Sequence, residues 1–355
     1  MHTIRVNVGK GYDINIGEGL LGKVGELVST VKSPECKAVV ITDSNVAKLH
    51  LFDCQQSLRA SGFDTTAVIF DAGEESKTMS MIGKILEGMA EKGVTRNDIV
   101  IALGGGVTGD MAGFAAGVYM RGIPFVQVPT TLLAAVDSSV GGKTAVDLPS
   151  GKNLAGLFYQ PEMVICDTLL LETLPEEEYK CGLAEAIKTG ILSDEELFRI
   201  FEEGDPKEKL PEIIARCAEY KAGVVMRDEK EKGERKLLNL GHTAGHAIEK
   251  LSNYEMKHGF AVAAGLGIIG RAASGLGYCS EETAKRIENV LLRNGLPVNT
   301  DFDDREIAEA ALSDKKRSGK TITIAVPISI GNCDLKEIET DNLEEIIMLG
   351  KKALK

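Results

Sequence analysis

The chain has 355 residues, 43% of them hydrophobic, which is enough for one large or two ordinary packed domains. Its formal net charge of −12 argues against nucleic acid or an anionic membrane as the main partner. The seven cysteines are odd in number and contain no CxxC pair, so neither a disulfide framework nor a thiolate zinc site is expected. With no secretory core and no membrane-spanning run, we expect a soluble, cytoplasmic protein.

Short apolar runs rich in β-branched residues mark the first half of the chain. They predict buried strands that end in loops, at 37–43, 66–71, 98–106, 124–131 and 163–168. Helical stretches separate at least the first three, which favours a parallel sheet with helices on both faces. Beyond this half the pattern is mostly helical, apart from a strand-like run at 321–328. We predict an α/β domain with a parallel, Rossmann-like sheet at 1–174, followed by an all-α domain at 175–355.

A glycine-rich turn follows the third predicted strand. Gly104, Gly106 and Gly109 satisfy the spacing G-x-G-x-x-G, in which the backbone turns tightly and a helix N-terminus faces a pyrophosphate. The match alone is weak, because the usual acidic residue some 20 positions later is missing and the turn is not in the first βα unit. Asp43, at the end of a strand, and the polar loop 73–77 favour a dinucleotide lying across several strand ends. A purely structural turn is the alternative.

Three of the five histidines lie within 17 residues of sequence, at 242, 246 and 258. His242 and His246 stand at i, i+4 on one face of a predicted helix, a spacing that suits a divalent metal. The glutamate of HExxH is absent, which argues against a metalloprotease. Glu185, in GLAEAIKTG, is a candidate ligand on another helix. Two ordinary buried histidines would explain the i, i+4 spacing equally well.

Several long segments together resemble the 3-dehydroquinate synthase family along nearly the whole chain. They are GGGVTGDMAGFAAGVYMRG (104–122), VPTTLLAAVDSSVGGKTAVD (128–147), GKNLAG (151–156), LAEAIKTG (183–190), RDEKEKGERKLLNLGHTAGHAIE (227–249), HGFAVAAG (258–265) and DKK (314–316). The resemblance implies a lyase of the shikimate pathway that converts 3-deoxy-arabino-heptulosonate 7-phosphate to 3-dehydroquinate and phosphate. Transient oxidation by NAD, phosphate elimination, reduction and aldol closure are the implied steps.

The resemblance also implies the cofactor sites. One divalent metal, zinc or cobalt, would be held by Glu185, His242 and His258, so that the helical domain binds the metal and His246 is not a ligand. NAD would be bound through residues spread over the first domain: Asp43, Glu74, Lys77, Gly105, Gly106, Asp110, Thr130, Thr131, Asp137, Lys143, Lys152 and the stretch near Thr173.

The substrate carries a carboxylate and a phosphate, and the resemblance assigns basic and polar side chains to both ends. Those implied for the carboxylate are Lys143, Lys221, Arg235 and Asn239. Those implied for the phosphate are Asn153, His246, a lysine of the Lys315–Lys316 pair, and Arg121, which could reach in from the other subunit of a homodimer. Lys152 and Lys188 would lie near the reacting hydroxyls.

One residue departs from the family pattern, which usually reads HGE where this chain has His258-Gly259-Phe260. The missing carboxylate removes a group that could hydrogen-bond near the implied metal ligand His258. We expect the residues around position 260 to repack locally without a change of function. Three other functions compete with the synthase. They are another sugar-phosphate cyclase with a neutral-headed substrate, a metal-dependent polyol dehydrogenase, and an inactive descendant that serves as a binding module.

Overall fold

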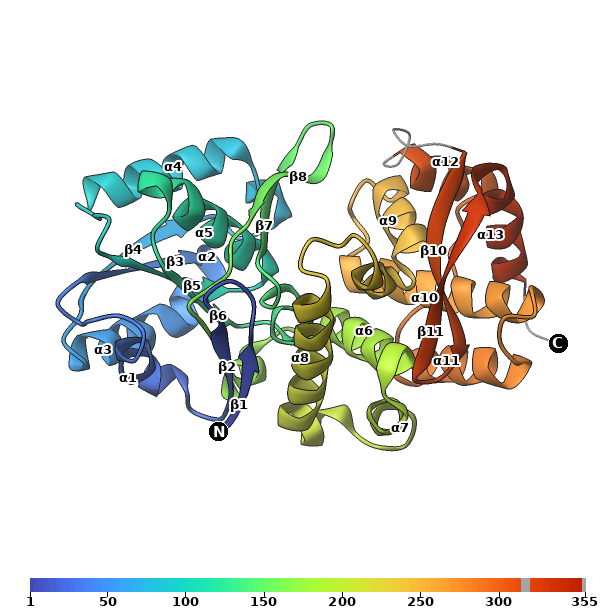
Figure 1. The fold of residues 1–355 in the computed structure, drawn as a ribbon, viewed down its shortest axis with the longest axis horizontal. Helices are drawn as coiled ribbons and strands as arrows, with labels where there is room; N and C mark the ends of the chain where they lie inside the picture. The colour runs from blue at the N-terminus through green and yellow to red at the C-terminus, as the bar shows by residue number, and fades with distance from the viewer. Residues whose placement is uncertain (314–319, 353–355) are drawn as a thin grey trace. The chain divides into compact units, whose positions relative to one another are not determined.

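The computed structural model describes residues 1–313 and 320–352. The chain divides into two compact units: unit 1 is Met1–Pro175 with Lys221–Glu229, and unit 2 is Glu176–Tyr220 with the described residues from Lys230 onward (Figure 1). The stretch Lys221–Glu229 lies within the predicted second domain but groups with unit 1. An ion pair contributes to this, because the Lys221 ammonium lies 2.9 Å from the Asp137 carboxylate.

A seven-stranded sheet forms the centre of unit 1, in the order β1-β2-β9-β6-β5-β3-β4. The β1–β2 pair is antiparallel, and the other neighbours pair in parallel. The strands are β1 His2–Val6, β2 Tyr12–Gly17, β3 Lys37–Asp43, β4 Asp64–Phe70, β5 Ile99–Gly104, β6 Phe125–Pro129 and β9 Met163–Asp167. The predicted parallel sheet is confirmed, and each of the predicted strands is present within a few residues of its expected ends.

Helices cover both faces of the sheet because successive strand residues point to opposite sides. Val40 and Ile101 pack with α1 (Val24–Ser29) and α3 (Phe52–Ala60). Their neighbours Ile41 and Val100 pack instead with α4 (Met79–Glu91) and α5 (Gly106–Val118). A short helix, α2 (Ser44–Val46), follows β3. This two-sided burial explains why the strands are apolar throughout rather than alternating.

Unit 1 also contains a hairpin that the sequence pattern did not predict. It pairs β7 (Lys143–Leu148) with β8 (Gly151–Phe158) in antiparallel register. Leu154 is 60% exposed and Phe158 46% exposed, so the apolar residues of β8 do not alternate between a core and a solvent face. Without that alternation, the usual sequence signal for a strand is missing.

Unit 2 is helical, as predicted, with one addition. Its helices are α6 Glu176–Ser193, α7 Glu195–Glu203, α8 Leu210–Arg227 up to Tyr220, α9 His242–Leu251, α10 His258–Gly275, α11 Glu281–Arg293, α12 Asp304–Ser313 and α13 Leu343–Lys351. Helix α10 is buried along most of its length and packs against α6, α9, α11 and α13. The addition is a hairpin of β10 (Thr321–Ser329) and β11 (Asn332–Glu339). The run at 321–328 predicted β10. The sequence pattern did not predict β11, in which exposed charged residues stand between the apolar ones.

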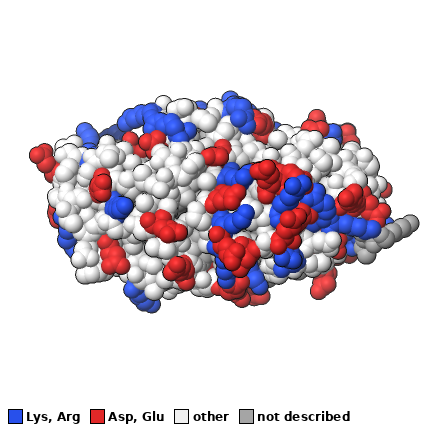
Figure 2. Space-filling view, turned by 90° about the horizontal axis from the view of Figure 1, so that it is seen from below, with Lys and Arg blue, Asp and Glu red and all other residues white. Residues whose placement is uncertain are grey.

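Acidic and basic side chains are interspersed on the face seen in Figure 2 rather than gathered into one basic area. In the part of the chain that the structure describes, no helix is long and apolar enough to cross a bilayer.

Asp167, at the end of β9, holds the chain that follows β2. Its carboxylate accepts hydrogen bonds from the backbone N–H groups of Gly19 (2.9 Å) and Leu21 (2.8 Å). Asp167→Ala should lower the free energy of unfolding by roughly 2 to 4 kcal/mol, because it leaves these donors without their acceptor. Asp167→Asn keeps one acceptor oxygen and should lose less. Urea denaturation would measure both, and an alanine variant as stable as the parent would contradict the assignment.

Candidate active site

The carboxyl edge of the parallel sheet gathers most of the predicted NAD residues. Strand β3 pairs with β4 on one side and β5 on the other, so the chain reverses its direction of progress across the sheet between β3 and β5. Ligands of open α/β sheets bind at such a reversal, outside the carboxyl ends of the strands. Asp43 ends β3 and Gly105 follows β5 at this point. This explains why the glycine turn stands after β5 rather than in the first βα unit.

The glycine turn leads into α5 without a side-chain cap at Gly105. An uncapped helix N-terminus presents backbone N–H groups and a positive dipole end to an anion. Glycine is needed at two positions of this turn because a side chain there would clash with a neighbour. A Cβ on Gly105 would lie 2.9 Å from Thr131 Cγ2, and one on Gly109 would lie 2.5 Å from Gln127 Oε1. The turn therefore meets both the structural interpretation and the requirements of pyrophosphate binding.

Predicted NAD residues follow the neighbouring strands as well. Glu74 lies in a turn after β4, Thr130 and Thr131 follow β6, and Thr173 ends the turn after β9. The Thr173 hydroxyl donates to the Leu170 carbonyl at 2.9 Å and lies 2.9 Å from His50 Nε2. Since the hydroxyl proton is already used, His50 donates to it. Burial lowers the pKa of His50, which favours this neutral imidazole. No sequence pattern predicted this contact.

A buried lysine connects several more of these residues. The Lys77 ammonium lies 2.8 Å from an Asp110 carboxylate oxygen and 2.6 Å from Asn153 Oδ1. Glu74 lies 3.9 Å from Lys77 and 3.4 Å from the Lys152 ammonium. Burial disfavours the charged lysine, but Asp110 and Glu74 outweigh it and raise the pKa of Lys77. Lys77 therefore keeps its charge in this cluster.

Asp137 lies in a five-residue π-helical turn, Ala134–Ser138. π-Helical turns are rare and often occur at functional sites. This one presents two acceptors to Lys221, the Asp137 carbonyl oxygen at 2.7 Å and its carboxylate at 2.9 Å. The structure thus brings together one residue predicted for NAD and one predicted for the substrate carboxylate.

In unit 2, three helices bring Glu185, His242 and His258 together. Glu185 Oε1 lies 3.3 Å from the Nε2 atoms of both His242 and His258. Ligands about 2.0 to 2.1 Å from a tetrahedral zinc are themselves about 3.3 Å apart. Both Glu185 oxygens are buried, and neither has a well-aligned hydrogen bond among the described residues, although Lys188 approaches Oε2 as an ion pair. A carboxylate and two imidazoles at this spacing fit a zinc-like divalent ion.

Charges around Glu185 keep it ionised. Burial alone would raise the pKa of Glu185, but Lys188 and His242 outweigh it and hold that pKa well below its ordinary value. The Lys188 ammonium lies 2.5 Å from the second oxygen, Oε2, and is itself buried. The carboxylate is therefore in the state that a metal requires.

His246 belongs to the same cluster. The ligand atoms of His242, His246 and His258 all lie within 4.8 Å of one another. Burial, together with the two neighbouring histidines, lowers the pKa of His246 to about 3, so its imidazole is neutral at neutral pH. The structure thus places all four candidates of the sequence analysis in one group, with the 3.3 Å spacing centred on Glu185.

The four side chains can meet because their helices approach closely. A Cβ on Gly259, next to His258, would collide with the backbone of Cys181, one turn before Glu185. Gly241 immediately precedes α9 with a φ of +77°, and a Cβ there would lie 2.8 Å from Leu266 Cγ on α10. Small residues at these crossings set the separation between α6, α9 and α10.

The remaining predicted residues that the structure describes lie in short turns and on the β7–β8 hairpin. Arg235 is 1% exposed, and Asn239, in the same turn Glu234–Asn239, donates to Glu231 at 2.8 Å. Lys143 lies exposed on β7. Arg121 and Asn153 have left-handed φ values of 70° and 57°, a strained conformation that occurs disproportionately at functional sites. Lys315 and Lys316 lie outside the described residues.

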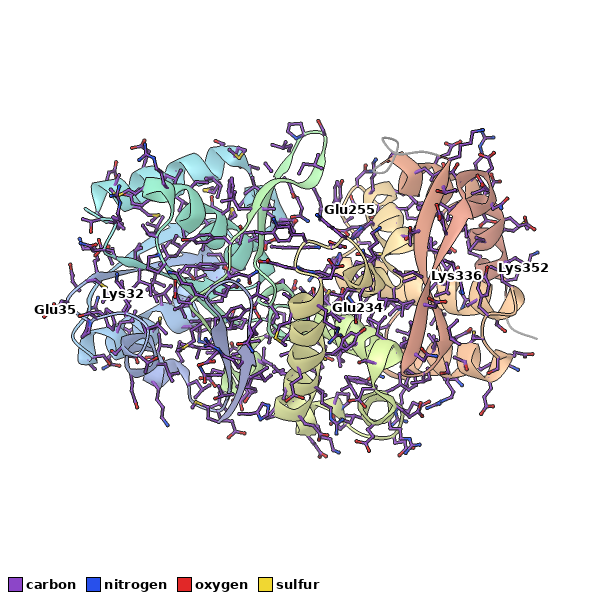
Figure 3. The ribbon with its side chains drawn as sticks, in the orientation of Figure 1. Lys32, Glu35, Glu234, Glu255, Lys336 and Lys352 are labelled. Carbon is purple, nitrogen blue, oxygen red and sulfur yellow. The ribbon has the colours of Figure 1, made fainter. Side chains whose placement is uncertain are left out.

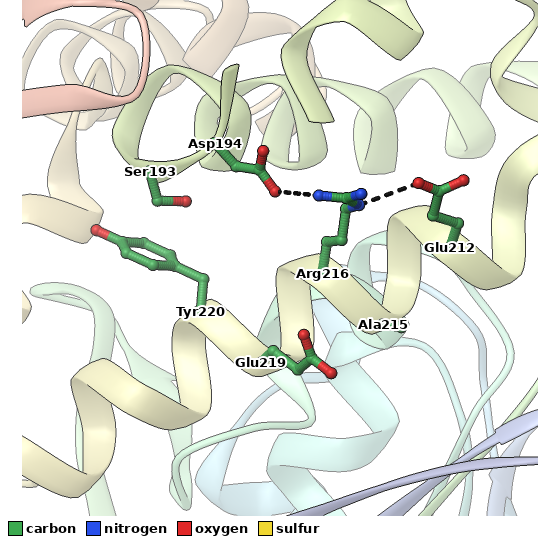
Figure 4. A pocket seen from close by; sticks show the side chains of 7 residues that line it. All are labelled: Ser193, Asp194, Glu212, Ala215, Arg216, Glu219 and Tyr220. Atoms are coloured by element: carbon green, nitrogen blue, oxygen red, sulfur yellow. Dashed lines mark hydrogen bonds and ion pairs between the residues drawn. The ribbon is translucent and has the colours of Figure 1, made fainter. Parts of the chain in front are cut away.

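A separate surface hollow of about 540 Å³ lies in unit 2 and contains none of the predicted residues. It is lined by Ser193, Asp194, Glu212, Ala215, Arg216, Glu219 and Tyr220. Figure 4 shows Arg216 held between Asp194 (2.8 Å) and Glu212 (3.1 Å). The candidate active-site residues are those described above within each unit, and none of them lines this hollow.

Gly259→Ala tests the helix crossing that positions His258 and Glu185. The added methyl should force α10 away from α6, lowering both metal affinity and stability, because the atom it meets is rigid backbone. Gly83→Ala on α4 is the matched control, since a Cβ there has nothing within 4 Å. The control should be neutral or slightly stabilising. Thermal melting with and without added zinc would measure both variants; equal behaviour would contradict a close crossing.

Comparison with known proteins places these features in a family. The profile of the 3-dehydroquinate synthase N-terminal domain matches residues 67–181, and that of the C-terminal domain matches residues 182–317. A 3-dehydroquinate synthase from Caldanaerobacter subterraneus subsp. tengcongensis is 46% identical over 347 residues, covering 95% of this chain and 97% of the relative.

Solved structures of two other cyclases have the same fold. A 2-deoxy-scyllo-inosose synthase complexed with carbaglucose-6-phosphate, NAD+ and Co2+ is 27% identical, with a TM-score of 0.85 over 98% of this chain and 99% of the other. A 2-epi-5-epi-valiolone synthase from Streptomyces hygroscopicus subsp. jinggangensis with NAD+ and Zn2+ bound is 25% identical, with a TM-score of 0.87 over 99% of each chain.

Proposed function

The chain belongs to the 3-dehydroquinate synthase family, and on that premise we propose that it is an NAD- and metal-dependent lyase. Its substrate would be 3-deoxy-arabino-heptulosonate 7-phosphate, and its products 3-dehydroquinate and phosphate. The convergence of the Glu185 carboxylate with the imidazoles of His242 and His258, at 3.3 Å, is the observation that carries this proposal.

Glu185, His242 and His258 would hold the divalent ion. Three protein ligands with a fourth position left for substrate or water are characteristic of catalytic zinc, which acts as a Lewis acid that polarises a hydroxyl or carbonyl. The two cyclases solved with Co2+ or Zn2+ bound support a metal of this kind. Lys188 would remain beside Glu185, near the reacting hydroxyls.

The carboxyl edge of the sheet in unit 1 would hold NAD, which accepts a hydride and returns it. The uncapped N-terminus of α5 suits its pyrophosphate, and Asp43 and Glu74 offer carboxylates to ribose hydroxyls. Asp43 already accepts N–H bonds from Asn45 and Val46 as the cap of α2, so it would serve both roles. NAD in both cyclase structures supports this part of the proposal.

Basic side chains in both units would recognise the two ends of the substrate. Lys221 and Lys143 in unit 1, with Arg235 and Asn239 in unit 2, are proposed for the carboxylate. Asn153, Arg121 and His246 are proposed for the phosphate. A buried guanidinium such as that of Arg235 can grip a carboxylate through two parallel hydrogen bonds. Lys152 would contact the reacting hydroxyls from β8.

We also propose a homodimer formed through the exposed apolar residues of β8 and the end of α5. Leu154, Leu157 and Phe158 on β8 are 60%, 39% and 46% exposed, and Val118 and Met120 beside them are 39% and 42% exposed. Leu157 packs over Gly117, so β8 and the end of α5 adjoin there, and the patch proposed for the interface consists of these five exposed side chains. An exposed apolar strand favours pairing with another chain. The strained Arg121 adjoins the patch, which supports its role across a subunit boundary.

A cytoplasmic location is also proposed, because free thiols such as those of this chain are usual in that compartment.

His242→Ala should abolish turnover, because it removes one of the metal ligands. Chelator treatment of the parent should do the same, and added zinc should restore the parent but not the variant. The assay would incubate protein with the heptulosonate phosphate, NAD and zinc, and follow inorganic phosphate. His2→Ala, at an exposed histidine of β1, is the control and should remain active. Full activity in metal-free parent protein would refute the metal site.

The same assay separates the competing functions. A synthase recycles its NAD, so phosphate should be released without net NADH, whereas a polyol dehydrogenase would accumulate NADH with glycerol. A cyclase for a neutral-headed sugar phosphate would release phosphate from a substrate without a carboxylate, such as glucose 6-phosphate, but not from the heptulosonate. Release from the heptulosonate alone is the expected result.

Arg235→Ala should lower kcat/KM for the heptulosonate phosphate if the guanidinium pairs a desolvated carboxylate. The expected decrease corresponds to a loss of transition-state stabilisation of about 2 kcal/mol or more. Arg199→Ala, at an exposed arginine of α7, is the matched control and should have little effect. Steady-state kinetics on both variants, with circular dichroism to check folding, would measure the difference. A folded Arg235→Ala enzyme with parental kcat/KM would remove that residue from the site.

A further inference from the structure

We propose that Glu249 is a positioning residue for the metal ligand His258, an inference that rests on the metal site of the proposed function. The Glu249 carboxylate lies 3.1 Å from His258 Nδ1. The opposite ring nitrogen, Nε2, lies 3.3 Å from Glu185 Oε1. The ring is therefore held at both nitrogens, by one carboxylate behind it and one beside the ion position.

The chemistry of the pair decides which nitrogen carries the proton. An ionised carboxylate can only accept hydrogen bonds, so Nδ1 of a neutral His258 must donate. The lone pair is then on Nε2, the atom that faces Glu185. His242 is arranged in the same sense, since its Nδ1 lies 3.1 Å from the Leu240 carbonyl oxygen. Both imidazoles therefore present a metal-binding nitrogen to the same point.

The fold places Glu249 for this contact. It stands two helical turns after His242 on α9, so the same face of that helix carries a metal ligand and the partner of another ligand. Its residue exposure is 4%. A buried carboxylate is costly unless it is hydrogen-bonded or paired, and the imidazole N–H contributes such a bond. Metal-bound histidines generally donate to a carboxylate, carbonyl or water in this way, which orients the ring and strengthens it as a ligand.

This contact also accounts for the departure at Phe260. Phenylalanine has no acceptor, so position 260 cannot orient His258 in this chain. The backbone N–H of Phe260 donates to the Lys257 carbonyl in the first turn of α10. The carboxylate that touches His258 Nδ1 comes from α9 instead, so the loss of a carboxylate at 260 leaves the ligand oriented.

The test is the metal affinity of Glu249→Gln, which keeps the shape and removes the charge. Chelator-stripped protein would be titrated with Co2+, with the visible absorption of the bound ion as the signal, and zinc affinity would be measured by competition with a chelating dye. We expect metal affinity to fall by about 10- to 100-fold and the cobalt spectrum to change. Glu249→Ala should lose more, because it also removes the acceptor.

Glu255→Gln is the matched control, because it removes the same charge from an exposed residue shortly after α9 (Figure 3). It should bind cobalt as the parent does. NAD affinity and the thermal midpoint without metal would show that Glu249→Gln is folded. A purely structural Glu249 would lower that midpoint but leave the affinity and the cobalt spectrum of the folded protein unchanged, which would overturn the inference.

The outcomes separate this inference from the proposed function. If the parent protein binds no cobalt, or binds it equally well as His242→Ala, the metal site itself fails. If the parent binds cobalt and His242→Ala does not, but Glu249→Gln matches the parent, only the positioning role fails.

Discussion

One buried carboxylate and two imidazoles must reach the same point from three different helices. Glu185 Oε1 is 3.3 Å from both Nε2 atoms, and this spacing depends on helices that approach at Gly259 and Gly241. Three neighbouring groups of unit 2 support this convergence. Lys188 keeps the carboxylate ionised, and the Leu240 carbonyl and Glu249 direct the two rings.

Buried lysines in this acidic chain are paired with carboxylates. Lys77 contacts Asp110, Lys188 contacts Glu185 and Lys221 contacts Asp137. A formal net charge of −12 therefore coexists with ammonium groups that are buried and held in fixed positions by neighbouring carboxylates. Holding them in advance lowers the cost of ordering long side chains when a ligand binds.

The parallel sheet was predictable because strands buried on both faces, such as 37–43 and 98–106, are apolar throughout. The hairpin of β7 and β8 was not, because its apolar residues are partly exposed and do not alternate. The second strand of the other hairpin, Asn332–Glu339, alternates with charges and was missed for a related reason. Sequence patterns record burial, and these strands are only half buried.

The candidate site shows the same limit at the level of single residues. The i, i+4 spacing of His242 and His246 predicted a pair on one helix, and both do lie in the cluster. Spacing could not identify Glu185, 57 positions before His242, or the role of Glu249, because those contacts depend on how helices cross. Glu185 and His258 were already candidates, and the resemblance to a family joined them with His242 as one ligand set, while Glu249 and His50 emerged from the structure alone.

Helix α10 has a consequence for how the protein responds to heat. Its first residue is His258, and the rest of its length packs against α6, α9, α11 and α13. An ion that binds only the folded arrangement adds its binding free energy to folding. The free energy of unfolding of the helical unit would then increase with metal occupancy. Growth conditions that deplete the metal would therefore also shorten the lifetime of the apoprotein.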